Sequence, residues 1–270
     1  MLKQIKSTTK FIQKQIDFVP KIGIILGTGL NKMTRMLENP IVLKYEDIPN
    51  FQTSTAPSHE GKLVFGTIAS TDIVIMQGRL HYYEGYSMKE ITFPIRVFKE
   101  LGIGTLIITN SAGSLNQDLQ PGDVALIKDH INFMHDNPLI GKNYPDLGNR
   151  FPSLHQQFSP ELQALARQIA KKEKFELKDA VYTAVTGPTL ETKAESLMLA
   201  KLGADIVGMS TVPEIITAVH SGLNLIAISA ITNLSNIFHS KEHSQIEIRE
   251  NAAKAAQKIQ KIILGIIKNY

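Results

Sequence analysis

Segments rich in glycine, hydroxyl groups and charge follow several short apolar runs of this chain. Gly27-Thr28-Gly29 comes directly after one run, and residues 77–86, which contain Arg79, His81 and Tyr83, follow another. The guanidinium of an arginine presents a fixed fork of donors to a phosphate, and a histidine can add one more hydrogen bond. Because open α/β sheets bind ligands beyond the carboxyl ends of their strands, these loops predict an anion-binding site.

Three later segments combine small, hydroxyl and acidic residues in a similar way: 109–115, 186–192 and 207–214. Glu191 stands just before an expected helix, where a carboxylate interacts favourably with the helix N-terminus. Thr211 and Glu214 have the spacing of a capping box, and such a helix start can also bind phosphate. Taken singly, each segment is explained as well by a tight turn or an ordinary helix cap, so both interpretations stay open.

Several familiar site signatures are missing from the sequence. The turn at 27–29 lacks the third glycine of a dinucleotide fingerprint, because position 32 is a lysine. There is no phosphate-binding P-loop, no Gly-x-Ser-x-Gly nucleophile turn and no cysteine. His239 and His243 lie four residues apart, but no glutamate stands in the frame of a zinc-binding helix. We therefore expect no metal and no cofactor.

Composition narrows the class of protein further. The chain has 270 residues with 43% hydrophobic and 20% charged residues, and a formal net charge of +4. Residues 1–21 hold five lysines against one aspartate, a net of +4, so the rest of the chain is balanced. That balance argues against nucleic acid as a partner. The apolar runs are too short to span a bilayer, and the N-terminus has no apolar signal region, so we expect a cytoplasmic protein without a membrane partner.

The elements that must position these groups alternate between β-rich runs and helical patterns. Strands are expected at 22–26, 63–68, 73–76, 105–109, 124–127, 180–184, 204–207 and 223–231. Helices are expected at 87–101, after Ser159-Pro160, after Thr192, after Thr211 and at about 245–268, with an amphipathic helix in 1–20 packed on the body. Two long segments, 47–61 and 132–158, read as functional loops. This alternation predicts a single α/β domain over residues 1–270.

Taken in order, the motifs resemble the purine nucleoside phosphorylase family, and more closely its trimeric, 6-oxopurine-specific class. The resemblance runs from about residue 20 to the last helix, on these segments: Leu26-Gly27-Thr28-Gly29-Leu30, Ser58-His59-Glu60-Gly61-Lys62-Leu63, Gly78-Arg79-Leu80-His81-Tyr82-Tyr83-Glu84-Gly85, Asn110-Ser111-Ala112-Gly113, Gly187-Pro188-Thr189-Leu190-Glu191-Thr192, Val207-Gly208-Met209-Ser210-Thr211-Val212-Pro213-Glu214 and Ile231-Thr232-Asn233. It implies a twisted mixed central sheet or distorted barrel flanked by helices. It also implies a homotrimer that catalyses the reversible phosphorolysis of purine (deoxy)ribonucleosides in purine salvage. Inorganic phosphate would be the co-substrate.

The resemblance also assigns residues to three subsites. Phosphate would be held by Thr28, Arg79, His81, Ser210, the backbone N–H of Ser111 and, as a secondary contact, His59. The purine would contact Glu191, Asn233, Leu190 and Val207. The ribose would contact Tyr83, Met209, His243 and a neighbouring subunit's copy of Leu147. The catalytic roles would fall to Asn233 at N7 and O6 of the leaving base, to Glu191 at N1–H, and to His81.

The remaining alternatives depend on five residues. Leu190 and Leu147 stand where relatives carry aromatic residues, which predicts weaker nucleoside binding or tolerance for xanthosine. Asn233 favours inosine and guanosine, whereas methylthioadenosine phosphorylases carry aspartate there. Either His243 or Gln245 would reach the 5′-hydroxyl. Xanthosine and methylthioadenosine phosphorylases, and more remotely a non-catalytic nucleotide-binding module, are the alternative functions.

Overall fold

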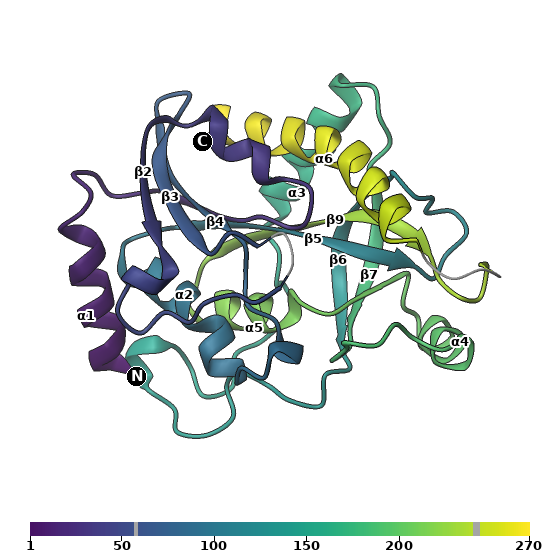
Figure 1. Cartoon of the computed structure of the whole chain (residues 1–270), viewed down its shortest axis with the longest axis horizontal. Coiled ribbons are helices and arrows are strands. Elements are labelled where there is room, and N and C mark those ends of the chain that lie inside the picture. Colours follow the sequence, from purple (N-terminus) through teal and green to yellow (C-terminus); the bar gives the residue numbers. More distant parts are fainter. Residues whose placement is uncertain (57–58, 240–243) are drawn as a thin grey trace.

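The computed structural model describes residues 1–56, 59–239 and 244–270. Within them, nine strands form one mixed sheet in the order β2-β3-β4-β1-β5-β8-β7-β6-β9 (Figure 1). The strands are β1 (Ile22–Ile25), β2 (Glu38–Lys44), β3 (Lys62–Ile68), β4 (Thr71–Gln77), β5 (Thr105–Ser114), β6 (Val124–Asn132), β7 (Lys178–Ala184), β8 (Ile206–Gly208) and β9 (Asn224–Leu234).

Strand β5 belongs to two parts of this sheet. Its first residues pair in parallel with β1, whereas Gly113 and Ser114 at its end pair with β8. A further pairing of β5 with β9 closes β5, β8, β7, β6 and β9 into a five-stranded barrel, from which β1, β4, β3 and β2 extend as an open sheet. The structure thus confirms the expected α/β architecture with a distorted barrel.

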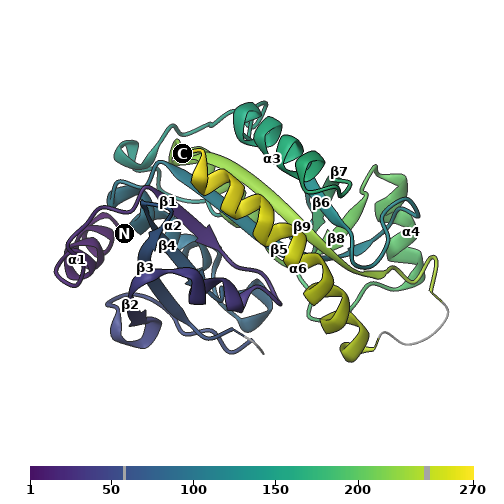
Figure 2. The same cartoon turned by 90° about the horizontal axis from the view of Figure 1, so that it is seen from above.

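Helices cover both faces of the sheet. They are α1 (Leu2–Gln13), α2 (Met88–Glu100), α3 (Pro160–Lys172), α4 (Lys193–Lys201), α5 (Val212–His220) and α6 (Gln245–Lys268). Viewed from above, α6 lies along β9, with α3 beside it (Figure 2). Successive strand residues point to opposite faces, so Ile24 packs into the core under α3 and α6, and Ile25 into the core under α1, α2 and α5.

The expected helix starts are mostly confirmed. The side chains of Ser87, Ser159 and Thr192 each accept a hydrogen bond from a backbone N–H of the first turn. The amphipathic N-terminal helix ends at Gln13 rather than near residue 20, and it packs on the body through Ile5 and Ile12. None of the helices within the described ranges is long and apolar enough to cross a membrane.

Strand β2 is an element that the sequence analysis did not predict. It is an edge strand whose side chains are mostly exposed, and its pairing with β3 is irregular between Glu38 and Ile41. Pro40 lies in that irregular stretch, where a missing N–H costs no ladder hydrogen bond. A strand with little apolar surface and an internal proline has no alternating pattern by which to recognise it.

Candidate active site

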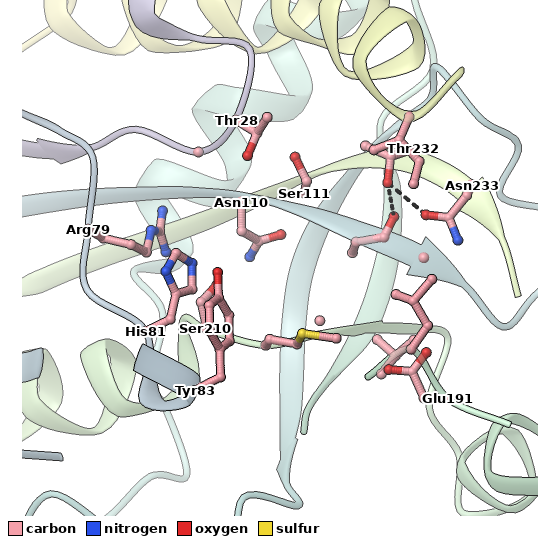
Figure 3. Close-up of a pocket in the computed structure, with 18 of the residues that line it drawn as sticks. Thr28, Arg79, His81, Tyr83, Asn110, Ser111, Glu191, Ser210, Thr232 and Asn233 are labelled. Carbon is pink, nitrogen blue, oxygen red and sulfur yellow. Dashed lines mark hydrogen bonds between the residues drawn. The ribbon is translucent and has the colours of Figure 1, made fainter. Parts of the chain in front are cut away.

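The motifs singled out in the sequence meet in one cavity of about 240 Å³ (Figure 3). Its walls come from the ends of β1, β4, β8 and β9, from the middle of β5, and from the connection before α4. The cavity is lined by these predicted site residues: Thr28, His59, Arg79, His81, Tyr83, Ser111, Leu190, Glu191, Val207, Met209, Ser210 and Asn233. In Figure 3, Arg79 and His81 lie at one end, and Glu191 and Asn233 at the other.

Arg79 is the permanent charge at the first end, which the family resemblance assigns to phosphate and which is called the phosphate end for that reason. Its side chain is 3% exposed, and its Nη1 lies 3.3 Å from Oε1 of Glu214, which is 4% exposed. Nη1 also donates to the hydroxyl of Thr211 at 3.2 Å, and Nη2 donates to the carbonyl of Thr109. These partners hold the guanidinium in one orientation, with the charge compensated inside the core.

Thr211 has an unusual backbone conformation for a β-branched residue. Its φ and ψ are 73° and −46°, and the N–H of Val212 donates to the carbonyl of Ser210 at 2.8 Å. These values describe a γ-turn of the rare, strained kind with positive φ. Helix α5 starts after Thr211 as expected, but the Thr211 side chain makes no cap hydrogen bond within the described structure. The side chain bonds to the phosphate end instead.

His81 is oriented by the carboxylate of Glu84. Oε1 of Glu84 lies 3.2 Å from Nδ1 of His81 and accepts the His81 N–H at 2.7 Å, while Oε2 accepts from the backbone and hydroxyl of Thr55. Burial raises the pKa of Glu84, but these hydrogen bonds outweigh it and lower the pKa to about 2. The ring of His81 stacks on Tyr83 with centroids 4.8 Å apart.

His59 lies beside this pair, with its ring 4.9 Å from that of His81. Its Nδ1 lies 2.8 Å from the carbonyl oxygen and 3.0 Å from the backbone nitrogen of Arg79. Burial, assisted by the nearby His81, lowers the pKa of His59 to about 4. His59 is thus a neutral ring at neutral pH that fixes the backbone of Arg79.

Two buried polar atoms of the cavity wall have no hydrogen-bond partner among the described residues: Oγ of Ser111 and Oδ1 of Asn110. Nδ2 of Asn110 donates to Thr211 at 2.9 Å, which leaves its oxygen free. An unsatisfied buried polar atom costs about 1–3 kcal/mol. Both atoms are therefore suited to hydrogen bonds with a bound polar ligand.

The second end, which the family resemblance assigns to the purine and which is called the purine end for that reason, carries a carboxylate and an amide. Oδ1 of Asn233 accepts from the hydroxyl of Thr232 at 2.9 Å, and its Nδ2 donates to the carbonyl of Leu234 at 3.3 Å. The backbone carbonyl of Glu191 accepts from Asn236 at 2.6 Å. Burial raises the pKa of the Glu191 carboxyl. Leu190 is 48% exposed, so this end is open on one side.

One predicted contact lies outside this cavity, and another falls outside the described residues. Leu147 packs half-buried against the chain's own core, and its carbonyl accepts from Arg96 at 3.1 Å; its expected role in a neighbouring subunit's site stays a prediction. His243 lies outside the described residues. Its alternative, Gln245, is the first residue of α6.

Ile248 lines the cavity but was not predicted as a site residue. Within an amphipathic helix it reads as one more core position, and periodicity does not distinguish a residue that faces a cavity from one that faces the core. Within the described ranges, no group of three His, Asp or Glu side chains could hold a metal ion.

The comparisons with known proteins all find phosphorylases. The sequence model of the Phosphorylase superfamily matches residues 21–268. The chain is 45% identical over 270 residues to purine nucleoside phosphorylase 1 of Bacillus subtilis, covering 100% of both chains. It is 42% identical to the purine nucleoside phosphorylase of Rattus norvegicus, over 95% of this chain and 91% of that one. The crystal structure of the Schistosoma mansoni purine nucleoside phosphorylase with inosine superposes with a TM-score of 0.94, at 38% identity over 100% and 97% of the two chains.

Proposed function

The chain belongs to the phosphorylase superfamily, and on that premise we propose that it catalyses the reversible phosphorolysis of 6-oxopurine ribonucleosides and 2′-deoxyribonucleosides. The products are the free base and (2-deoxy)ribose 1-phosphate. One observation carries the proposal: a single cavity joins an arginine-centred anion site to a carboxylate and an amide at its opposite end.

At the phosphate end, the anion would meet Arg79, His81, the hydroxyls of Thr28 and Ser210, and the backbone N–H of Ser111, with His59 behind them. A phosphate oxygen forms a bond to C1′ of the sugar as the bond from C1′ to N9 of the base breaks. The nucleophile is the substrate phosphate itself, so the protein contributes position and charge stabilisation. Donors already fixed before the reaction are suited to this task.

At the purine end, the electron pair of the broken bond passes to the base, which gains a proton at N7. Asn233 would bridge N7 and O6, since a neutral amide can donate to an oxo group. Glu191 would accept the hydrogen bond from N1–H, with Leu190 and Val207 against the ring. In the ribose region, Tyr83 and Met209 would contact hydroxyls of the sugar, and His243 or Gln245 the 5′-hydroxyl.

Xanthosine is a second candidate substrate, because Leu190 leaves one side of the purine end open. We also propose that the enzyme works in the cytoplasm as a homotrimer, without a cofactor. These proposals extend the resemblance to the trimeric class, with the segment 132–158 as the expected subunit contact; light scattering of the purified chain tests the trimer.

A substrate panel tests the proposal. Inosine, guanosine, xanthosine, adenosine and methylthioadenosine are each incubated with and without phosphate, and the released base is measured. We expect phosphate-dependent release from inosine and guanosine. Release from methylthioadenosine alone would assign the enzyme to a different substrate class. No release from any nucleoside would contradict the proposal and favour a binding protein.

A further inference from the structure

The hydroxyl of Thr211 joins three residues of the phosphate end. It lies 3.2 Å from Nη1 of Arg79, 2.9 Å from Nδ2 of Asn110 and 3.0 Å from Oγ of Ser210. These partners come from three separate segments of the chain, and each of them lines the cavity. Thr211 itself is fully buried behind them.

The chemistry of the partners fixes the direction of every hydrogen bond in this group. A guanidinium N–H and an amide N–H can only donate, and a hydroxyl has one hydrogen and two lone pairs. Arg79 and Asn110 therefore occupy both lone pairs of the Thr211 oxygen. Its one hydrogen is left for Oγ of Ser210, which must accept it.

Ser210 accordingly accepts from Thr211 and keeps its own hydrogen for another partner. Ser210 lines the cavity, where the deprotonated oxygens of an anion are hydrogen-bond acceptors. The γ-turn at Thr211 gives the geometric reason for the arrangement, because it turns the Thr211 side chain away from the cap of α5 and towards Arg79.

We infer that Thr211 is a positioning residue. It fixes the hydroxyl of Ser210 as a donor to the bound phosphate, and it holds the guanidinium of Arg79 in place beside that hydroxyl. The inference rests on the proposed function. Thr211 touches no substrate; it acts through the direction of its hydrogen bonds. This is a role for the Thr-x-x-Glu spacing other than the helix cap that it suggests.

The test compares three single variants. Thr211→Val keeps the β-branched shape and removes the hydroxyl, Thr211→Ser keeps the hydroxyl, and Thr217→Val is the control. Thr217 lies in α5, the helix that follows Thr211; it is fully buried, and its hydroxyl has no partner in the described part of the chain. We expect Thr211→Val to raise KM for phosphate about tenfold, the size of one lost hydrogen bond. The KM for inosine stays unchanged, and Thr211→Ser and Thr217→Val behave like the parent chain.

A double variant separates positioning from simple structural support. If Thr211 acts through Ser210, the loss in Thr211→Val/Ser210→Ala is smaller than the product of the two single losses. A product of independent losses would overturn the inference, and so would a Thr211→Val protein with a lowered melting temperature but an unchanged KM for phosphate. Titration calorimetry with inorganic phosphate alone provides the independent measurement. If the parent chain binds phosphate and cleaves no nucleoside, the proposed function fails while this titration still decides the role of Thr211.

Discussion

The two ends of the cavity are built differently. At the phosphate end, the side chains of Arg79 and Glu214 are 3% and 4% exposed and pair with each other inside the core. At the purine end, Leu190 is 48% exposed and Glu191 lies on the connection before α4. The phosphate end is thus part of the core of a single chain, whereas the purine end has an exposed wall. Changes at the phosphate end should therefore disturb binding and folding together, and changes at the purine end should act chiefly on substrate preference.

The largest effect is expected from Arg79→Gln. It removes the charge that faces the anion and leaves Glu214 without its buried partner, so kcat/KM for inosine should fall by about 10³-fold and the melting temperature should drop. Arg167→Gln is the control, because Arg167 pairs with Asp179 at 2.8 Å on the surface. Steady-state kinetics and thermal unfolding measure both effects. A stable but inactive Arg79→Gln protein would break the link between folding and binding at this end.

At the purine end, we expect Asn233→Asp to change substrate preference. An aspartate can accept from a 6-amino group but, when ionised, cannot donate to a 6-oxo group. The ratio of kcat/KM for adenosine to that for inosine should rise by about 10²-fold, with an unchanged melting temperature. Asn269→Asp, at the exposed end of α6, is the matched control. A constant ratio would mean that Asn233 does not read the 6-substituent.

A smaller gain is expected from Leu190→Phe. An aromatic ring at this exposed position would stack on the base, worth about 0.5–1.5 kcal/mol beyond its buried area. The KM for inosine should fall about two- to tenfold, and the KM for phosphate should stay constant. Leu197→Phe controls for added surface area, since Leu197 is 43% exposed on α4. Equal KM values for Leu190→Phe and the parent chain would show that Leu190 does not face the base.

The smallest effect concerns the pH dependence of the free energy of unfolding, to which the two ends should contribute with opposite signs. The pKa of His59 is lowered from 6.5 to about 4 in the folded chain, so the unfolded chain takes up this proton first as the pH falls. His59 therefore lowers the free energy of unfolding as the pH drops from about 6.5 towards 4. The raised pKa of Glu191 acts in the opposite direction, because the folded state then binds its proton more readily.

Denaturant titrations from pH 7 to pH 4 measure this difference. His59→Gln should make the free energy of unfolding fall less steeply with decreasing pH, and Glu191→Gln should make it fall more steeply. His155→Gln, an exposed site, is the control. Identical slopes in all four proteins would contradict the assigned pKa directions.

The sequence predicted which residues form the site better than it predicted their hydrogen bonds. Loops after apolar strands predicted an anion-binding site, the family resemblance supplied the individual residues, and Thr28, Arg79, Ser210 and Asn233 do line one cavity. Periodicity and strand ends report which backbone segments are buried. They do not report a side chain's partner: the spacing at Thr211 left a helix cap and a phosphate site both open, and its side chain bonds to Arg79 and Asn110 instead.

Elements with few buried residues were the least predictable. Strand β2 has an exposed, proline-containing edge sequence, and its position depends on pairing with β3 rather than on its own pattern. Ile248 faces the cavity only because of how α6 lies beside β9. Such features depend on tertiary contacts between distant segments, which local propensity does not contain.

The pairing of β5 with β9 has a consequence for the order of events during synthesis. Residues 105–114 pair with residues 224–234, so the barrel closes only after most of the chain has left the ribosome. Contacts between segments this far apart in sequence form slowly, and the pairing edge of β5 stays open until then. A nascent chain that ends before β9 lacks Asn233 and presents the open edge of the apolar strand β5. Synthesis of β9 and then α6 should therefore convert an aggregation-prone intermediate into a closed barrel with a complete site.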